Sequence, residues 1–144
     1  MNPRTVTRHF LASCQDTLRI VMYKFTDKKT AQWIKTLLKQ GVVVEMVMDG
    51  QAAVDENERP WAALVSRGMQ LRIWPPRSGK LHAKFALADG SDLLTGSSNW
   101  TSSGMVGNFE VLLWSRTPSV VASYEEIFRS LWQAAEPLQG EDEK

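Results

Sequence analysis

The sequence predicts an α/β fold in which a mixed β-sheet of about six strands is flanked by helices on both faces. Stripes of apolar residues with helical spacing alternate with short, nearly continuous apolar runs, which are typical of strands inside a sheet. Glycine ends two of the predicted helices just before a strand, at Gly41 and Gly68. The 144 residues suffice for one domain with a substantial core. We expect this domain to cover residues 1–136 and residues 137–144 to form a disordered tail.

The first half of the chain is expected to form three helices and three strands. Ala31, Ile34 and Leu37 follow helical spacing after Thr26 and Asp27, either of which can cap that helix. Pro60 is well suited to the first turn of another helix. In chain order, the expected elements are a helix at 5–14, a strand at 18–25, a helix from Asp27 to Gly41, a strand at 42–48, a loop at 49–57, a helix from Pro60 to Gly68 and a strand at 71–74.

The second half is expected to contain a β-hairpin. Residues 81–88 alternate so that a strand has one apolar face and one face carrying His82 and Lys84. Asp89-Gly90-Ser91 is a typical hairpin turn, and residues 93–95 can return antiparallel to the first strand. The remaining expected elements are a short helix that can start within residues 100–103, a strand at 108–115 and a helix that starts at Pro118.

The hairpin is expected to bring four chemically distinctive side chains together. An antiparallel return of the chain sets Ser97 and Asn99 beside His82 and Lys84. These residue types suit phosphoryl transfer, because imidazole is a nucleophile near neutral pH and Lys and Asn can hold phosphate oxygens. An Asp or Glu can fix the imidazole tautomer and favour its cationic form. No cluster with metal-ligand spacing accompanies the set, so we expect neither a metal nor another cofactor.

This stretch resembles the HKD motif of the phospholipase D superfamily. The matching residues are His82, Lys84, Asp89, Gly96, Ser97 and Asn99. The chain is most similar to the branch with a single motif, which contains small bacterial endonucleases and Zucchini-type mitochondrial endonucleases. Other segments that resemble that branch are Tyr23-Lys24-Phe25-Thr26, Gly41–Val44 and Asn99–Thr101. The resemblance extends over residues 18–132 and implies a phospholipase D-like sandwich fold.

The resemblance further implies a metal-independent phosphodiesterase that works through a phosphohistidine intermediate. One histidine cannot attack phosphorus and also protonate the leaving group on the opposite side, and the only other histidine, His9, lies outside any motif. We therefore expect a homodimer in which two His82 side chains share one active site. The other roles expected from the family are phosphate binding by Lys84 and Asn99, support of this binding by Ser97, and orientation and charging of the histidines by Asp89 and Glu110. The alternative for Asp89 is that it only forms the hairpin turn.

The charge distribution favours a nucleic-acid substrate, DNA or RNA. The formal net charge is only +1, but residues 59–88 contain six basic residues and no acidic one, which suits a polyanion. The alternative is that these residues are ordinary solvated faces. The loop at 74–80 leads into the motif strand, where aromatic and basic side chains can stack on or pair with a nucleotide. Besides Lys84 and Asn99, the candidate substrate contacts are Trp74, Arg77, Lys80 and Trp100, with a place in the core as the alternative for Trp74.

Two other functions remain open: a phospholipase or lipid phosphodiesterase, and a nucleic-acid-binding module with a weak or vestigial site. A lipase would require an exposed apolar or amphipathic membrane face, for which only the first helix is a candidate. No run of about 18 apolar residues is present, and the N-terminus lacks the apolar core of a signal peptide. We therefore expect a cytoplasmic protein without stable membrane association, although a chain cut from an exported or anchored parent would look the same.

Overall fold

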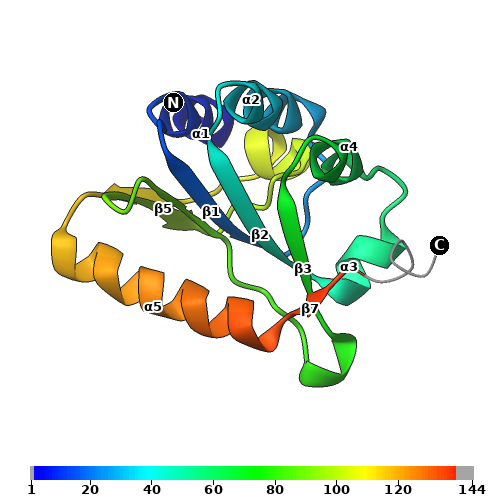
Figure 1. The fold of residues 1–144 in the computed structure, drawn as a ribbon. Coiled ribbons are helices and arrows are strands. Elements are labelled where there is room, and N and C mark those ends of the chain that lie inside the picture. The colour runs from blue at the N-terminus through cyan, green and yellow to red at the C-terminus, as the bar shows by residue number, and fades with distance from the viewer. Residues whose placement is uncertain (1, 139–144) are drawn as a thin grey trace.

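The computed structural model describes residues 2–138, which form one seven-stranded mixed sheet with helices on both faces (Figure 1). The strands follow the order β6-β5-β4-β1-β2-β3-β7 across the sheet. In chain order, the elements are α1 (Pro3–Ala12), β1 (Thr17–Met22), α2 (Lys28–Lys39), β2 (Val43–Asp49), α3 (Gly50–Asp55), α4 (Pro60–Ser66), β3 (Gln70–Trp74), η1 (Pro76–Ser78), β4 (Phe85–Ala88), β5 (Asp92–Gly96), η2 (Ser103–Gly107), β6 (Leu112–Ser115), α5 (Pro118–Ala134) and β7 (Glu136–Pro137). The predicted α/β class is confirmed.

The helices form two layers around the sheet: α1, α2 and α4 cover one face, and α5 covers the other (Figure 1). The larger core cluster includes Phe10 of α1 and Ile34 of α2, together with Ile20 and Met46 from the sheet. A smaller cluster includes Val121 and Phe128 of α5 with Val21, Val47, Phe85 and Leu87 of the sheet. The central strands are therefore buried from both sides, which explains why they read as almost uninterrupted apolar runs.

Aspartate side chains cap two helices and connect one of them to the motif. Asp27 accepts a hydrogen bond from the Thr30 N–H at 3.1 Å, so of the two expected capping residues it is Asp27 that caps α2. Asp49 accepts one from the Ala52 N–H at 2.9 Å, so the loop expected at 49–57 contains the helix α3. Its six residues are too few for a helical period to be recognised in the sequence. The other oxygen of Asp49 accepts a hydrogen bond from the Leu81 N–H at 2.8 Å and so anchors the segment that precedes the motif.

The ends of several elements differ from the expectations. The strands expected at 81–88 and 108–115 are shorter in the structure, where they correspond to β4 and β6. Residues 81–84 and 108–111 therefore lie outside the strands, and they include site residues. Pro137, assigned to a disordered tail from the sequence, instead pairs with Arg72 of β3 as part of β7, which is the strand beyond the expected six. Residues 139–144 of the expected tail lie outside the described residues. Within residues 2–138, no helix has the length and apolar character needed to span a bilayer.

Candidate active site

The hairpin of β4 and β5 brings the motif residues to one end of the sheet. Phe85 pairs with Thr95, so the beginning of β4 lies beside the end of β5. The antiparallel contact continues beyond the strand, because the Gly96 N–H donates to the Lys84 carbonyl at 3.4 Å. The expected antiparallel return is therefore confirmed, and it places the segment before β4 next to the segment after β5.

His82 and Lys84 are in direct contact within this segment. Lys84 Nζ lies 2.8 Å from Nδ1 of His82 and donates to the His82 carbonyl oxygen at 2.7 Å. The His82 imidazole is exposed and lies against the Tyr23 ring, with 4.6 Å between the ring centroids. The Lys84 side chain is buried, and its ammonium lies 5.8 Å from the centroid of the same ring. Tyr23 thus holds both side chains in place.

The surroundings of His82 favour its neutral form. Partial burial, followed by the positive charges of Lys84 and Lys80, lowers the pKa of His82 below its ordinary 6.5, and Asp49 opposes this with a smaller effect. The unprotonated imidazole is the nucleophilic form at neutral pH. The expectation that carboxylates keep this histidine charged therefore does not hold within one chain. Burial also lowers the pKa of Lys84, and the carboxylate of Glu110 opposes that shift.

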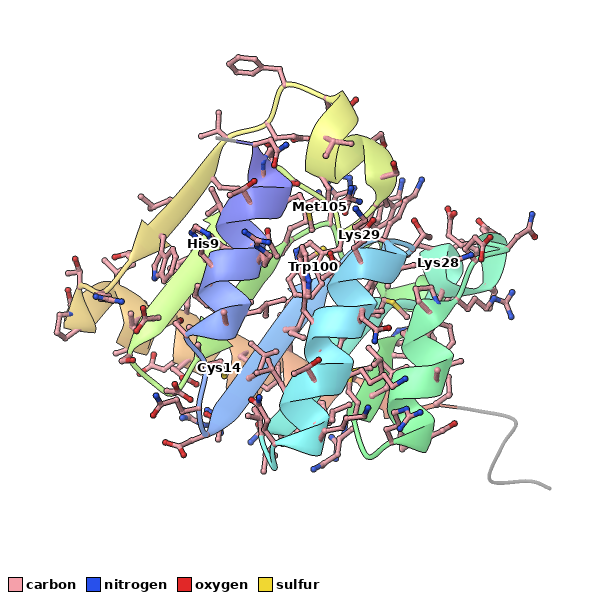
Figure 2. All side chains as sticks on the ribbon, turned by 90° about the horizontal axis from the view of Figure 1, so that it is seen from above. His9, Cys14, Lys28, Lys29, Trp100 and Met105 are labelled. Atoms are coloured by element: carbon pink, nitrogen blue, oxygen red, sulfur yellow. The ribbon has the colours of Figure 1, made fainter. Side chains whose placement is uncertain are left out.

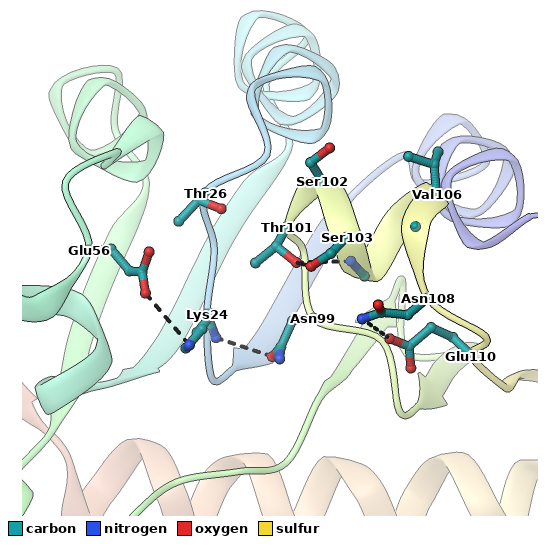
Figure 3. Close-up of a pocket in the computed structure, with 12 residues that line it drawn as sticks. Lys24, Thr26, Glu56, Asn99, Thr101, Ser102, Ser103, Val106, Asn108 and Glu110 are labelled. Atoms are coloured by element: carbon teal, nitrogen blue, oxygen red, sulfur yellow. Dashed lines mark hydrogen bonds and ion pairs between the residues drawn. The ribbon is translucent and has the colours of Figure 1, made fainter.

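A polar cleft of about 600 Å³ opens between Asn99 and Glu110 (Figure 3). Asn99 Oδ1 accepts a hydrogen bond from the Lys24 N–H at 3.3 Å, so the Nδ2 group is the end of the amide available to a phosphate oxygen. The Lys24 ammonium lies 3.7 Å from a carboxylate oxygen of Glu56. The other residues that line the cleft are Thr26, Thr101, Ser102, Ser103, Gly104, Val106, Gly107 and Asn108.

Ser97 and Glu110 form a pair of their own at the edge of the cleft. Ser97 Oγ donates to Glu110 Oε1 at 2.6 Å and accepts a hydrogen bond from the Val111 N–H at 3.1 Å. The other carboxylate oxygen of Glu110 accepts one from Asn108 Nδ2 at 3.2 Å. Within residues 2–138, no carboxylate forms a hydrogen bond with His82. The expected contact from Glu110 to the histidine is therefore not made inside a single chain.

Asp89 lies away from the other motif residues, at the opposite end of β4. It occupies the hairpin turn with a φ of 58°. Its carboxylate accepts hydrogen bonds from the N–H groups of Gln15 at 2.9 Å, Asp16 at 2.7 Å and Thr17 at 3.0 Å. Burial opposes ionisation of this carboxyl group, but the backbone N–H groups outweigh that effect and lower its pKa. The expected role in orienting the histidine is wrong for the folded chain: Asp89 ties the hairpin turn to the segment before β1.

Of the four additional substrate contacts expected from the sequence, only Lys80 lies at the site. Its ammonium is 5.4 Å from the centroid of the Tyr23 ring that covers His82. Trp74 packs against the core cluster under α5, and Arg77 forms an ion pair with Glu136 of β7. The fourth residue, Trp100, is buried beneath α1 and α2 (Figure 2) and packs edge-on against the Phe25 ring.

Tyr23 and Lys24 are functional candidates that the motif alone does not reveal. They follow β1, whose antiparallel neighbour is β4, with Val21 opposite Phe85. Continuing that register past both strands sets Tyr23 and Lys24 opposite the segment that contains His82. The signal in the sequence is their position at the end of an apolar strand, and it becomes usable only once the partner of that strand is known. Within residues 2–138, no group of three or more His, Cys, Asp or Glu side chains is arranged to hold a metal ion.

Comparison with known proteins identifies the family. Residues 7–132 match the family described as "Cardiolipin synthase, PLD-like domain". The mitochondrial cardiolipin hydrolases of Danio rerio and Xenopus tropicalis are 31% and 33% identical to this chain over 127 and 129 residues. Each match covers 88% of this chain but only 56% and 60% of the relative, so the chain spans little more than half the length of these curated relatives.

Two solved structures share the fold. Nuc, a phospholipase D family member from Salmonella typhimurium, has a TM-score of 0.85 at 22% identity, and the match covers 95% of this chain and 91% of Nuc. NucT from Helicobacter pylori has a TM-score of 0.84 at 18% identity, and the match covers 93% of this chain and 89% of NucT. As the motif predicts, the chain belongs to the phospholipase D superfamily, in the family of PLD-like domains that matches residues 7–132.

Proposed function

We propose that this protein is a metal-independent phosphodiesterase, and that it acts as an endonuclease on DNA or RNA through a phosphohistidine intermediate in a homodimeric active site. The observation that carries the proposal is the position of His82. Its imidazole is exposed, lies 2.8 Å from Lys84 Nζ and packs on the same Tyr23 ring as the Lys80 ammonium. A nucleophile among fixed positive charges suits attack on a phosphodiester, whose non-bridging oxygens carry the negative charge.

In the first step, His82 of one protomer attacks phosphorus, and a P–N bond forms as the P–O bond to the leaving group breaks. The partner subunit's His82, in its protonated form, gives its proton to the leaving oxygen. Binding of the phosphate anion favours this protonated form, because an opposite charge raises the pKa of an imidazole. Lys84 and the Nδ2 group of Asn99 hold the non-bridging oxygens throughout.

In the second step, the intermediate is hydrolysed. The partner subunit's His82 is now neutral and takes a proton from water, whose oxygen attacks phosphorus. The P–N bond breaks, and its electron pair returns to the imidazole of the attacking His82. Both histidines end in their starting protonation states, so the cycle needs no further proton donor.

A polyanionic substrate fits the charges around the cleft. Three lysine ammonium groups, of Lys24, Lys80 and Lys84, lie 5.4–5.8 Å from the centroid of the Tyr23 ring. The cleft next to them is lined mostly by polar residues, among them Lys24, Asn99 and Glu110. This supports binding of a phosphate backbone, with an affinity that falls as salt rises.

A lipid phosphodiesterase is the second candidate function. It is favoured by the names of the curated relatives, which are mitochondrial cardiolipin hydrolases. Exposed apolar side chains beside Glu110, among them Phe109 and Val111, also suit contact with a lipid surface.

The test is a cleavage assay in EDTA on labelled single- and double-stranded DNA and RNA, with cardiolipin vesicles assayed in parallel. We expect wild type to cut nucleic acid and His82→Ala to lose activity by at least ~10³-fold. His9→Ala, which changes the other histidine outside the site, should retain full activity. Hydrolysis of cardiolipin alone would favour the lipid phosphodiesterase, and salt-dependent binding without products would favour a binding module.

A further inference from the structure

Lys24 supplies the one positive charge among the described residues that line the polar cleft. Its backbone is fixed, because the Lys24 N–H donates to Asn99 Oδ1 at 3.3 Å and the Lys24 carbonyl accepts a hydrogen bond from the Trp100 N–H at 3.2 Å. The side chain extends from this fixed point and lies between Glu56 and Asn99 (Figure 3). Lys24 is therefore well placed to meet an anion that enters the cleft.

Of the three lysines around the Tyr23 ring, Lys24 has the weakest influence on His82. Its ammonium lies 5.5 Å from the centroid of that ring, whereas Lys84 Nζ lies 2.8 Å from His82 Nδ1 itself. In agreement with this placement, Lys84 and Lys80 lower the pKa of His82 more than Lys24 does. Lys84 is thus the lysine beside a phosphate under attack, and Lys24 is available to a different phosphate.

The carboxylate of Glu56 lies against Lys24. Glu56 directly follows α3, and its backbone is held on both sides: its N–H donates to the Ala52 carbonyl at 3.2 Å, and its carbonyl accepts a hydrogen bond from Arg59 Nε at 2.9 Å. One carboxylate oxygen of Glu56 lies 3.7 Å from the Lys24 ammonium. Glu56 thus presents a negative charge at the place where Lys24 would hold a substrate anion.

The contact between Glu56 and Lys24 is weak enough for a phosphate to displace it. Its length of 3.7 Å exceeds that of a hydrogen bond, and the two side chains remain 33% and 39% exposed. Exposed ion pairs of this kind change an equilibrium constant by about fivefold at most. A phosphate oxygen can instead accept a charge-assisted hydrogen bond from the same ammonium, which is a stronger contact. Glu110, the other carboxylate of the cleft, is held by Ser97 and Asn108 and so stays in place.

We infer that Lys24 binds a second phosphate of a nucleic-acid strand, near the one that is cleaved, and that Glu56 holds this place in the free protein. The inference rests on the proposed function, which supplies the strand. Phosphates recur about every 3.4 Å along the axis of one strand of a duplex, so a strand with one phosphate at His82 carries others within reach of Lys24. The pair thereby favours substrates with several phosphates, because only these offset the loss of the Glu56 contact.

The experiment compares two substrates in EDTA: a labelled single-stranded oligonucleotide, and bis(p-nitrophenyl) phosphate, which contains a single phosphate. Lys24→Met should raise KM for the oligonucleotide by roughly 10-fold at unchanged kcat, and it should leave kcat/KM for the small substrate within about twofold of wild type. Glu56→Gln should lower KM for the oligonucleotide by roughly threefold to fivefold. The control is Glu58→Gln, which removes an exposed carboxylate that pairs with Lys28 outside the cleft and should change neither reaction.

A double variant separates competition at Lys24 from a general effect of charge. Glu56→Gln added to Lys24→Met should have no further effect on KM, because the lysine for which Glu56 competes is then absent. Fluorescence anisotropy measures the affinity of the same variants for the oligonucleotide in the His82→Ala background, where the strand stays intact, and should show the same pattern. Circular dichroism checks that each variant is folded.

Each outcome decides a different point. Effects that are confined to the oligonucleotide and absent from the double variant support the inference. Equal losses on both substrates in Lys24→Met overturn it, because Lys24 would then act at the phosphate that is cleaved. A gain from Glu56→Gln that persists without Lys24 overturns the competition. An effect of Lys24→Met on cardiolipin vesicles alone also overturns the inference, since the second phosphate would then belong to a lipid. A wild type that hydrolyses neither phosphodiester overturns the proposed function, while the anisotropy pattern still decides the role of Lys24.

Discussion

Replacing Asp89 by Asn should destabilise the protein and leave its chemistry almost unchanged. The side chain accepts hydrogen bonds from three consecutive backbone N–H groups, those of Gln15, Asp16 and Thr17. Asn is the right replacement because it tolerates the positive φ of this turn and removes only the charge and one acceptor oxygen. The variant therefore isolates the contribution of the carboxylate.

The expected loss follows from those three bonds. A hydrogen bond to a charged group contributes about 1.5–3 kcal/mol and a neutral one about 0.5–1.5 kcal/mol. Because the Asp89 carboxylate is partly exposed, we discount the difference and expect a loss of about 2–3 kcal/mol in the free energy of unfolding. For a chain of this size, that corresponds to a fall of roughly 5–10 °C in Tm.

Thermal unfolding and steady-state kinetics of the same sample give the assay. We expect Asp89→Asn to keep kcat/KM within about threefold of wild type when measured well below its lowered Tm. An unchanged Tm together with a loss of activity above 100-fold would refute the reasoning, since it would place Asp89 in the chemistry. Ser91→Ala, a change in the same turn that leaves the Asp89 contacts intact, serves as the control.

The same contacts predict how the effect depends on pH. The pKa of Asp89 is lower in the folded protein than its ordinary 3.8, so the unfolded chain binds the proton first as pH falls. The stability that the carboxylate contributes is present above that ordinary value and is lost as pH falls through the lower, folded pKa. The difference in unfolding free energy between wild type and Asp89→Asn should therefore be constant near neutral pH and shrink below about pH 4. Urea titrations at several pH values measure it.

Two further substitutions test the site. Gly104→Ala should reduce kcat/KM by at least ~10-fold, because the added Cβ would lie 2.3 Å from the Asn99 carbonyl oxygen and push Asn99 from the cleft. The control is Gly107→Ala, which should be tolerated because its Cβ would meet nothing closer than 3.6 Å. Lys80→Met should raise the pKa of His82 and so move the acidic limb of the pH profile of kcat/KM to higher pH. Lys39→Met, at an exposed helix end, should leave the profile unchanged. Equal pH profiles for the two lysine variants would contradict this electrostatic account.

The sequence predicted the parts of the site that depend on local pairing. His82 and Lys84 are brought to Gly96 and Ser97 because a tight turn joins two neighbouring strands, and turn residues and period-two patterns are visible in a sequence. The same logic locates Asp89 in the turn, and thus at the far end of β4. Its membership in the motif suggested a role in catalysis, but only the position of the neighbouring segment 15–17 shows what its carboxylate binds.

What the sequence did not predict depends on contacts between distant segments. Tyr23 reaches His82 because β1 pairs with β4, and the sequence contains no local signal for that pairing. Trp100 follows Asn99 directly, yet its ring packs on Phe25 in the core while Asn99 faces the cleft. Glu110 contacts Ser97 because the irregular segment 108–111 returns beside the end of β5, a path that no periodic pattern marks.

The most direct test of the central claim is a search for a covalent intermediate on His82. Wild-type protein is mixed with labelled nucleic acid in EDTA and quenched within the first turnover, and its peptides are analysed by mass spectrometry. We predict a phosphoryl adduct on the peptide that contains His82, and no adduct on the corresponding peptide of His82→Ala. Full cleavage by His82→Ala, or an adduct on another residue, would contradict the account.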